Sequence, residues 1–239
     1  MAIVVQISDT HLRAEPNTPP DRNPDAALSA TIAAVRDVRA DLVVLTGDLS
    51  DDGSIAALSR VRDFAGQLSA PILALAGNHD DPVNVREVFG TTDMMEVGSW
   101  RVLTVQSVIP GQDHGSVDVE ALTGRLDRLD DRPTVLAIHH PPRSPSTHPM
   151  FRLIGAERML TALRVRRHVV AVISGHLHES FDRRDGDLYL CGAPSSYYAI
   201  EHEGNLYEFD RGGIIGAQVL MLGDDGSFSC ERVARSLGC

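Results

Sequence analysis

Short apolar runs with the length of β-strands alternate with helix-like segments along most of this chain, and this alternation restricts the folds open to it. The strand-like runs are residues 3–7, 42–45, 71–75, 134–138 and 169–173. Between them, apolar side chains recur three or four positions apart, as at Leu28, Ile32 and Val35, which is the spacing of one helix face. Strands that alternate with helices favour an α/β fold in which helices cover a mixed sheet.

Helix N-caps and further strand-like runs in the last part of the chain support the same fold class. Asn23 precedes Pro24, and Ser54 and Asp118 precede further apolar patterns, as expected for helix N-caps. From Phe181 onward, strands are predicted at residues 188–191, 207–209, 217–222 and 228–233. We therefore expect two mixed sheets packed face to face and flanked by helices. No repeat or low-complexity linker interrupts the chain, so residues 1–239 are expected to form a single domain.

The charge of the chain argues against polyanionic partners. The net charge is −11 at pH 7, so nucleic acid would be repelled, and a small anionic substrate would need metal ions or a local arginine cluster. Every basic residue is arginine, which excludes a P-loop lysine and a Schiff-base lysine. The chain has neither a G-x-S-x-G serine motif nor an H-E-x-x-H metalloprotease motif.

The cysteines and the N-terminus bear on the cellular compartment. Cys191, Cys230 and Cys239 show no C-x-x-C spacing and are odd in number. This pattern favours reduced thiols in a cytoplasmic protein over a disulfide framework or a thiolate zinc site. The N-terminus enters a strand-like run without a basic, cleavable leader, and no apolar run approaches the roughly 18 residues of a membrane span. We therefore expect a cytoplasmic protein without a membrane span.

Polar residues with metal-binding side chains follow the strand-like runs. They are Asp9, His11, Asp48, Asn78, His79, His139, His176 and His178. In open α/β sheets, ligands bind outside the carboxyl ends of the strands, so these side chains are expected to meet there. Carboxylate, amide and imidazole groups without thiolates are typical ligands of Mn, Fe or Zn ions. They are not typical of a structural zinc finger.

The spacing of these residues suggests how they are shared between ions. In an extended segment, residues two apart point the same way. Asp9 and His11 can therefore face one ion, and His176 and His178 can face one cluster. Without His79, these residues supply seven ligands, which are too many for one tetrahedral ion and suit two ions that share a bridging carboxylate.

Glycine stands directly before three of the polar residues, at Gly47, Gly77 and Gly175. Because glycine adopts backbone conformations that other residues rarely adopt, we expect the chain to turn sharply at each of them as it leaves a strand.

Five sequence blocks together resemble the calcineurin-like metallophosphoesterase superfamily. They are Asp9-Thr10-His11, Gly47-Asp48, Gly77-Asn78-His79-Asp80, His139-His140-Pro141-Pro142 and Gly175-His176-Leu177-His178. The blocks follow the order of the superfamily, and five in order at strand ends are specific where one alone would be weak. Ala193-Pro194-Ser195-Ser196 and the terminal strands resemble, less strongly, the class III cyclic-nucleotide phosphodiesterase branch. The resemblance implies a four-layer α/β/β/α sandwich.

The resemblance also implies a ligand assignment for two divalent ions. One ion would be held by Asp9, His11, Asp48 and His178, and the other by Asp48, Asn78, His139 and His176. Asp48 would bridge the two ions. His139 matches the ligand position because Pro141 follows it at the second position, so His140 would lie at the rim of the site or behind the ligands. No ligand of the family pattern is missing.

The implied mechanism needs no protein nucleophile. Two divalent ions about 3.5–4 Å apart can share a bridging hydroxide with a lowered pKa and clamp the phosphoryl oxygens. By resemblance, His79 would reach the phosphoryl group and stabilise its developing charge or protonate the leaving oxygen. We therefore expect Asp48 and His79 to be catalytic, and Asn78, His79 and His140 to contact the substrate.

The function expected from these residues is a phosphodiesterase that acts on small phosphodiesters, with cyclic nucleotides as the first substrates to test. A glycerophosphodiesterase or a phosphomonoesterase would use the same metals. Outside enzymes, the fold can serve as a protein-binding scaffold, as in a retromer subunit of this superfamily, although such a protein would be expected to lose ligands. A homodimer is expected from the resemblance alone.

Neighbouring polar residues have simpler structural explanations. The pair Asp51 and Asp52 fits a helix entry better than a third set of metal ligands. Tyr197 and Tyr198 can stack on a base, but hydrophobic packing is the favoured interpretation.

Overall fold

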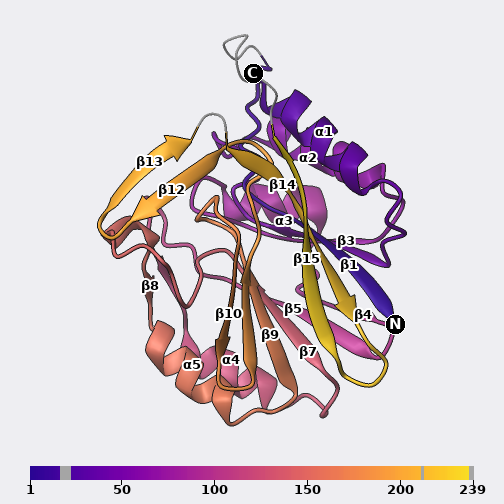
Figure 1. Ribbon diagram of the computed structural model, residues 1–239, viewed down its shortest axis with the longest axis vertical. Helices are drawn as coiled ribbons and strands as arrows, with labels where there is room; N and C mark the ends of the chain where they lie inside the picture. The colour runs from indigo at the N-terminus through magenta and orange to yellow at the C-terminus, as the bar shows by residue number, and fades with distance from the viewer. Residues whose placement is uncertain (17–22, 211–212, 237–239) are drawn as a thin grey trace.

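Two large sheets form the centre of the computed structural model, which describes residues 1–16, 23–210 and 213–236 (Figure 1). One sheet has five strands in the order β15-β14-β1-β2-β3, and the other has six in the order β10-β11-β9-β7-β5-β4. Both sheets combine parallel and antiparallel neighbours. The two mixed sheets expected from the sequence are thereby confirmed.

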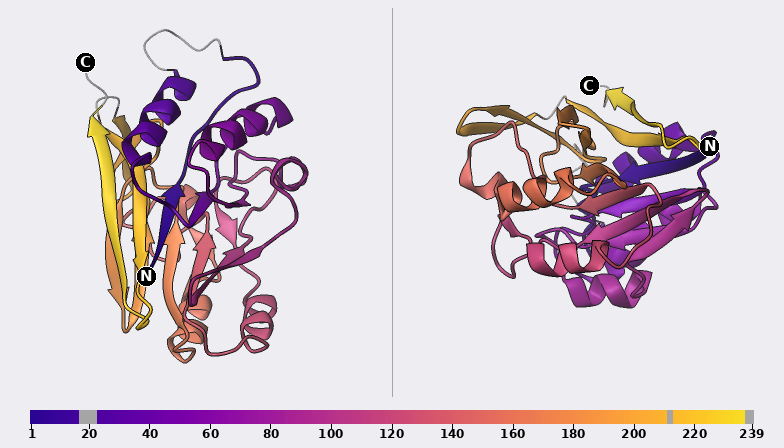
Figure 2. Two further views of the ribbon diagram at one scale, coloured as in Figure 1. Left: turned by 90° about the vertical axis from the view of Figure 1, so that its right-hand side faces the viewer. Right: turned by 90° about the horizontal axis from the view of Figure 1, so that it is seen from below.

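The five-stranded sheet is built from both ends of the chain. Its strands are β1 (Ala2–Ile7), β2 (Leu42–Thr46), β3 (Ile72–Leu75), β14 (Ile214–Leu222) and β15 (Phe228–Ser236). The first three run parallel, and β14 pairs with β1 in the antiparallel direction. In Figure 2 the yellow β15 forms one outer border of this sheet. Helices α1 (Pro24–Val35), α2 (Ile55–Gly66) and α3 (Pro82–Phe89) belong to this half of the molecule.

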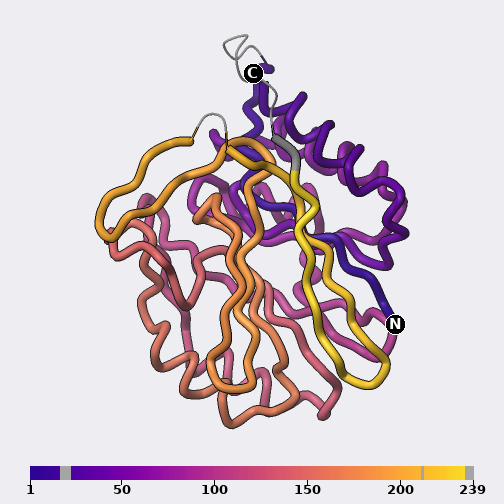
Figure 3. Tube along the Cα trace, in the orientation of Figure 1, coloured from indigo at the N-terminus to yellow at the C-terminus, as the bar shows by residue number. Residues whose placement is uncertain are grey.

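The six-stranded sheet comes from the middle of the chain. Its strands are β4 (Met94–Val97), β5 (Trp100–Val105), β7 (Thr134–Ile138), β9 (Val169–Ser174), β10 (Phe181–Asp185) and β11 (Leu188–Gly192). Helices α4 (Val119–Leu126) and α5 (Ala156–Arg164) pack against it. The smaller elements are β6 (Gly115–Ser116), β8 (Leu153–Ile154), the short helix η1 (Pro149–Phe151), β12 (Ala199–Glu203) and β13 (Leu206–Asp210). Figure 3 shows the orange β12–β13 hairpin beside the loop that leads into β8.

Three apolar clusters hold these layers together. Trp100, Leu73 and Leu220 belong to the cluster between the two sheets. Leu28 of α1 belongs to the cluster under the helices of the five-stranded sheet, and Leu160 of α5 to the cluster under those of the other sheet. The layers are therefore stacked in the order helices, sheet, sheet, helices. In Figure 1, α1 and α2 lie at the upper right, while α4 and α5 lie at the lower left.

The expected caps are present, and one helix was not foreseen. Asn23, Ser54 and Asp118 each accept hydrogen bonds from backbone N–H groups at the start of α1, α2 and α4. Helix α3 was not assigned from the sequence. The side chain of Asp81 caps it, and Pro82 occupies its first turn. This cap and proline are the signal that identifies a helix start.

The strands bring both halves of the chain to one edge. The backbone N–H of Asp9, after β1, donates to the carbonyl of Gly47, after β2, over 3.0 Å. After β7 and β9, the N–H of Gly175 donates to the carbonyl of His139 over 3.1 Å. Across the two sheets, the N–H of His176 donates to Oδ1 of Asp9 over 3.0 Å, so the carboxyl ends of these four strands meet at one place. Among the described helices, none has the length and apolar character needed to cross a membrane.

Candidate metal centre

A first group of potential ligands gathers around the loop after β1. Its members are Asp9, His11, Asp48 and His178, whose potential ligand atoms all lie within 4.8 Å of one another. Nε2 of His11 lies 3.1 Å from Nε2 of His178, and Nε2 of His178 lies 3.6 Å from Oδ1 of Asp9. All four side chains are buried. The structure thus brings together the four residues expected around one ion.

A second group lies on the other side of Asp48. Nε2 of His139 lies 3.1 Å from Oδ1 of Asn78 and 3.4 Å from Oδ1 of Asp48. The ring centroid of His176 is 5.0 Å from that of His139. Asn78, His139 and His176, expected to hold the second ion with Asp48, are therefore neighbours.

The carboxylate of Asp48 stands between the two groups. Its Oδ1 faces Nε2 of His139, while its Oδ2 lies 3.8 Å from Nε2 of His11. Each oxygen of Asp48 therefore faces a different histidine. This is the arrangement that a bridging carboxylate requires.

The backbone at the potential ligands adopts a conformation that non-glycine residues rarely take. Positive φ angles occur at Asp9 (53°), His11 (47°), Asp48 (48°), His176 (70°) and His178 (52°). Each such residue costs free energy that the surrounding structure must offset. Strain concentrated at five potential ligands indicates that the fold positions these side chains for a function. No composition or spacing signal in the sequence reveals these angles.

The glycines of the sequence blocks serve two different purposes. Of the three glycines before potential ligands, Gly47 has a positive φ angle of 91°. At Gly77, a Cβ atom would collide with Asp48, and at Gly175 it would collide with Ser8 and approach Asp9. These two glycines instead allow neighbouring strand ends to approach closely.

Backbone carbonyls orient three of the histidines. Nδ1 of His178 donates to the carbonyl of Tyr198 over 2.9 Å, and Nδ1 of His139 donates to that of Thr46 over 2.8 Å. Nε2 of His176 donates to the carbonyl of Met150 over 3.0 Å. A histidine that donates from one ring nitrogen presents the other as a lone-pair donor. The free nitrogens of His139 and His178 are the ones that face Asp48 and Asp9.

His140 lies behind the ligands. Its side chain is fully buried, Nδ1 lies 2.8 Å from Oγ of Ser107, and Nε2 lies 2.9 Å from the carbonyl of Asp113. Burial lowers its pKa to about 3, so the ring is neutral. Both ring nitrogens are engaged by the protein. Of the two expected positions, the geometry favours the one behind the ligands over the rim.

His79 is the most accessible histidine of this region. Its side chain is 40% exposed, and Nδ1 lies 3.4 Å from Oδ1 of Asp51. The hydrogen bond to Asp51 raises the pKa of His79 to about 9, so the imidazolium form predominates at neutral pH. The same Asp51 oxygen lies 3.2 Å from Nδ1 of His11. Asp51 therefore joins His79 to the first group, a role that the helix-entry interpretation missed.

Charges inside the site are tightly balanced. Burial raises the pKa of Asp9 to about 6. Burial alone would also raise the pKa of Asp48, but His139 and His11 outweigh it and hold that pKa well below its usual range. Burial lowers the pKa values of His176 and His178 well below the ordinary value. The neutral rings of His176 and His178 are the form in which imidazole binds a divalent cation. At His139 burial alone would lower the pKa, but Asp48 outweighs it and raises that pKa to about 9, so a cation bound there would have to displace a proton.

Asp80 is a structural residue that sequence reasoning did not assign. Its buried carboxylate accepts backbone N–H groups of Leu49 (3.1 Å), Ser50 (2.8 Å) and Gly77 (2.9 Å). It thereby fixes the loop that carries Asp48 to the loop that carries Asn78. The signal was present in the sequence, because Asp80 belongs to the Gly77-Asn78-His79-Asp80 block.

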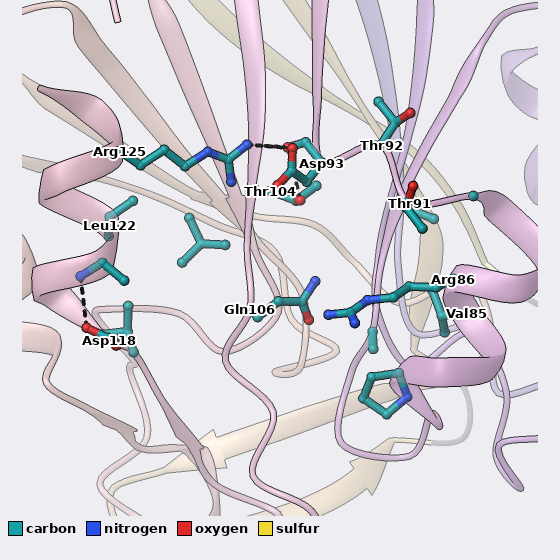
Figure 4. Close-up of a pocket in the computed structure, with 17 residues that line it drawn as sticks. Val85, Arg86, Thr91, Thr92, Asp93, Thr104, Gln106, Asp118, Leu122 and Arg125 are labelled. Atoms are coloured by element: carbon teal, nitrogen blue, oxygen red, sulfur yellow. Dashed lines mark hydrogen bonds and ion pairs between the residues drawn. The ribbon is translucent and has the colours of Figure 1, made fainter. Parts of the chain in front are cut away.

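Two cavities have volumes in the range of small-molecule sites. One of about 350 Å³ is lined by His148, Phe151 and Arg152, among others, and the ring of Phe151 lies 5.3 Å from that of His176. The other, of about 490 Å³, lies between α3 and α4 (Figure 4). There Arg125 pairs with Asp93. None of the potential ligands lines either cavity, but the smaller one shares Phe151 with the surroundings of His176.

The donor set suits two divalent cations. Carboxylate, amide and imidazole groups are ligands of Mn, Fe and Zn, and the two groups of donors share one carboxylate. Tyr198 packs against His178, with ring centroids 4.2 Å apart, as the packing interpretation expected.

Comparisons with known proteins agree with this geometry. The family model described as calcineurin-like phosphoesterase matches residues 3–180. A probable cyclic nucleotide phosphodiesterase from Synechococcus is 32% identical over 205 residues, covering 81% of this chain and 80% of that protein. The 3′,5′-cyclic adenosine monophosphate phosphodiesterase of Pseudomonas aeruginosa is 30% identical over 236 residues, covering 94% and 86%.

Among solved structures, a dimetal phosphatase from Danio rerio has the same fold. It aligns with a TM-score of 0.67 at 13% identity and covers 99% of each chain. The family model covers most of this chain, and the relatives match it over most of their own length. The chain therefore belongs to the calcineurin-like phosphoesterase family.

Proposed function

We propose that this protein is a metal-dependent phosphodiesterase that hydrolyses small phosphodiesters, with cyclic nucleotides as its first candidate substrates. The observation that carries the proposal is the position of Asp48 between two donor groups, with one oxygen toward His139 and the other toward His11. Bound in these groups, two divalent cations would activate water and offset the charge of the phosphoryl group.

The protein residues have distinct roles in this proposal. Asp9, His11 and His178 hold one cation, and Asn78, His139 and His176 hold the other. His79 carries a proton on its accessible ring, and Asp51 fixes the orientation of that ring at Nδ1. A protonated, partly exposed imidazole beside the donor groups can stabilise the phosphoryl charge or give a proton to the leaving oxygen.

The choice of a small diester rests on the surroundings of the donors. The cavity of about 350 Å³ beside Phe151 is in the size range of small-molecule sites. No donor lines this cavity, but Phe151, which lines it, also contacts the ring of His176, so the cavity and the second donor group share Phe151 as a neighbour. The two relatives described as cyclic nucleotide phosphodiesterases favour a nucleotide as the organic part.

A substrate panel tests the proposal. The protein is loaded with Mn, and hydrolysis of bis(p-nitrophenyl) phosphate is compared with that of p-nitrophenyl phosphate. Cyclic AMP, cyclic GMP, 2′,3′-cyclic nucleotides and glycerophosphodiesters are then compared by kcat/KM. The proposal expects a diester preference and a cyclic nucleotide among the best substrates. A preference for the monoester would identify a phosphomonoesterase, and a preference for glycerophosphodiesters would identify a glycerophosphodiesterase.

The proposal extends to the compartment and the assembly. We place the enzyme in the cytoplasm as a homodimer. Cell fractionation tests the first statement, and light scattering coupled to size-exclusion chromatography tests the second. A protein that bound no metal and hydrolysed none of the panel would instead support the scaffold function, because a scaffold needs no cations.

A further inference from the structure

Two cysteine thiols from different sheets meet in the interior of the protein. Cys191 belongs to β11 of the six-stranded sheet, and Cys230 belongs to β15 of the five-stranded sheet. Both are free thiols, and their Sγ atoms lie 3.3 Å apart in a hydrogen bond. Cys239 lies outside the described residues. The contact brings together two residues that sequence spacing did not connect.

The two thiols differ in access and in acidity. Cys191 is only 1% exposed, whereas Cys230 is half-buried and so can be reached from solvent. The hydrogen bond with Cys191 lowers the pKa of Cys230, and the charge of Arg232 adds to this effect. The same hydrogen bond and burial raise the pKa of Cys191. Cys230 is therefore the thiol more easily converted to the reactive thiolate.

We propose that Cys191 and Cys230 form a reversible disulfide when the protein meets a hydroperoxide. The Cys230 thiolate attacks the terminal oxygen of the peroxide, forming a sulfenic acid and releasing water or an alcohol after protonation. The sulfur of Cys191 then displaces water from this sulfenic acid and loses its proton, which leaves one S–S bond. The peroxide is reduced by two electrons, and the two thiols together are oxidised by two.

A metal site formed by the same thiols is the competing interpretation. The carboxylate of Asp182 lies within 4.8 Å of the two sulfurs, so three donor atoms are available. Two thiolates on one tetrahedral zinc ion lie about 3.7 Å apart for Zn–S bonds of about 2.3 Å. The observed 3.3 Å is shorter, and Asp182 is exposed. The geometry favours the disulfide.

The bond would constrain a segment that contacts the metal centre. It would close the chain from residue 191 to residue 230, a span that contains Ser195 and Tyr198. The hydroxyl of Ser195 donates to the carbonyl of Asp9 over 2.8 Å, and the carbonyl of Tyr198 accepts from His178. It would also join the two sheets covalently. A loop of this length predicts a rise in Tm of roughly 5–15 °C.

Peroxide titration of the full chain tests the proposal without reference to phosphodiesterase activity. The protein is treated with hydrogen peroxide, quenched with catalase and digested without reductant for mass spectrometry. We expect a peptide that links Cys191 to Cys230, the loss of two hydrogen atoms from the intact mass, a higher Tm, and reversal of all three by dithiothreitol. C239S should behave in the same way, while C191S and C230S should show no rise in Tm.

Three results would overturn the proposal. One is oxidation of Cys230 to a sulfinic acid without a linked peptide in the wild-type chain. Another is a link from either thiol to Cys239. The third is a result in which one equivalent of zinc protects both thiols from oxidation in the wild-type chain but not in D182N. This would assign the cluster to a metal. C191A and C230A provide a second pair of variants if either serine variant fails to fold.

Discussion

Nε2 of His11 and Nε2 of His178 lie 3.1 Å apart, although 167 positions separate these residues in the chain. The loops after β1 and β9 bring them together, and Asp51 and the carbonyl of Tyr198 occupy their other nitrogens. Two imidazole lone pairs directed at one another repel unless a proton or a cation lies between them. Because His11 and His178 both have positive φ angles, the strained backbone holds two lone pairs where a cation could bind them.

Replacement of Asp48 and of His79 should separate cation binding from the chemical step. We expect Asp48→Ala to lose both bound metal and turnover, because its two oxygens face both donor groups. His79→Ala should keep its metal but lose about 10²-fold or more in kcat, as for a lost proton donor. Metal analysis and kcat on the same preparations make the comparison, with His168→Ala as the control. Two ions retained by Asp48→Ala would contradict the bridging role.

Asp51 should act on the reaction through the two histidines that it contacts. Asp51→Asn keeps the size of the side chain but weakens the hydrogen bonds to His79 and His11, and we expect kcat to fall about 10–100-fold. Asp51→Glu should restore part of kcat. The matched control is Asp52→Asn, because Asp52 accepts backbone N–H groups of Ala14 and Ser54. Equal kcat losses at the two positions would argue against a specific role for Asp51.

Close approach of the strand ends predicts opposite outcomes for two glycine substitutions. Gly175→Ala places a methyl group against Ser8 and Asp9, so we expect a loss of about 1–3 kcal/mol in unfolding free energy and weaker metal binding. Gly66→Ala adds a methyl group at the end of α2, where nothing lies within 4 Å, and should stabilise by about 0.4–1 kcal/mol. Urea unfolding measures both. A neutral Gly175→Ala would show that the strand ends can separate freely.

Asp80 should contribute more to stability than its neighbour Asp81. Asp80→Ala leaves three buried N–H groups without their acceptor, and we expect a loss of at least about 3 kcal/mol. Asp81→Ala removes only the cap of α3 and should cost about 1 kcal/mol. For each variant, the shift of the urea midpoint multiplied by the common slope gives the loss in unfolding free energy. Equal losses would mean that Asp80 does not tie the two loops together.

The sequence predicted most strands and most caps because these depend on local patterns. The run 134–138 and the N-cap Asp118 were identified correctly because apolar length and capping chemistry are written in neighbouring residues. The resemblance also named the residues that gather around Asp48. The positive φ angles, by contrast, arise from tertiary packing, and so do the space required at Gly175 and the meeting of Cys191 with Cys230. Such features depend on residues far apart in the chain, so no local pattern signals them.

Metal content is the most direct test of the central claim that this site binds two cations and uses them for hydrolysis. The protein is stripped with a chelator, titrated with Mn, and assayed for bound metal by mass spectrometry and for bis(p-nitrophenyl) phosphate hydrolysis at each step. We predict no activity in the stripped protein, recovery with Mn that Ca does not match, and saturation at two ions per chain. Full activity without metal, or saturation of activity at one ion, would contradict the claim.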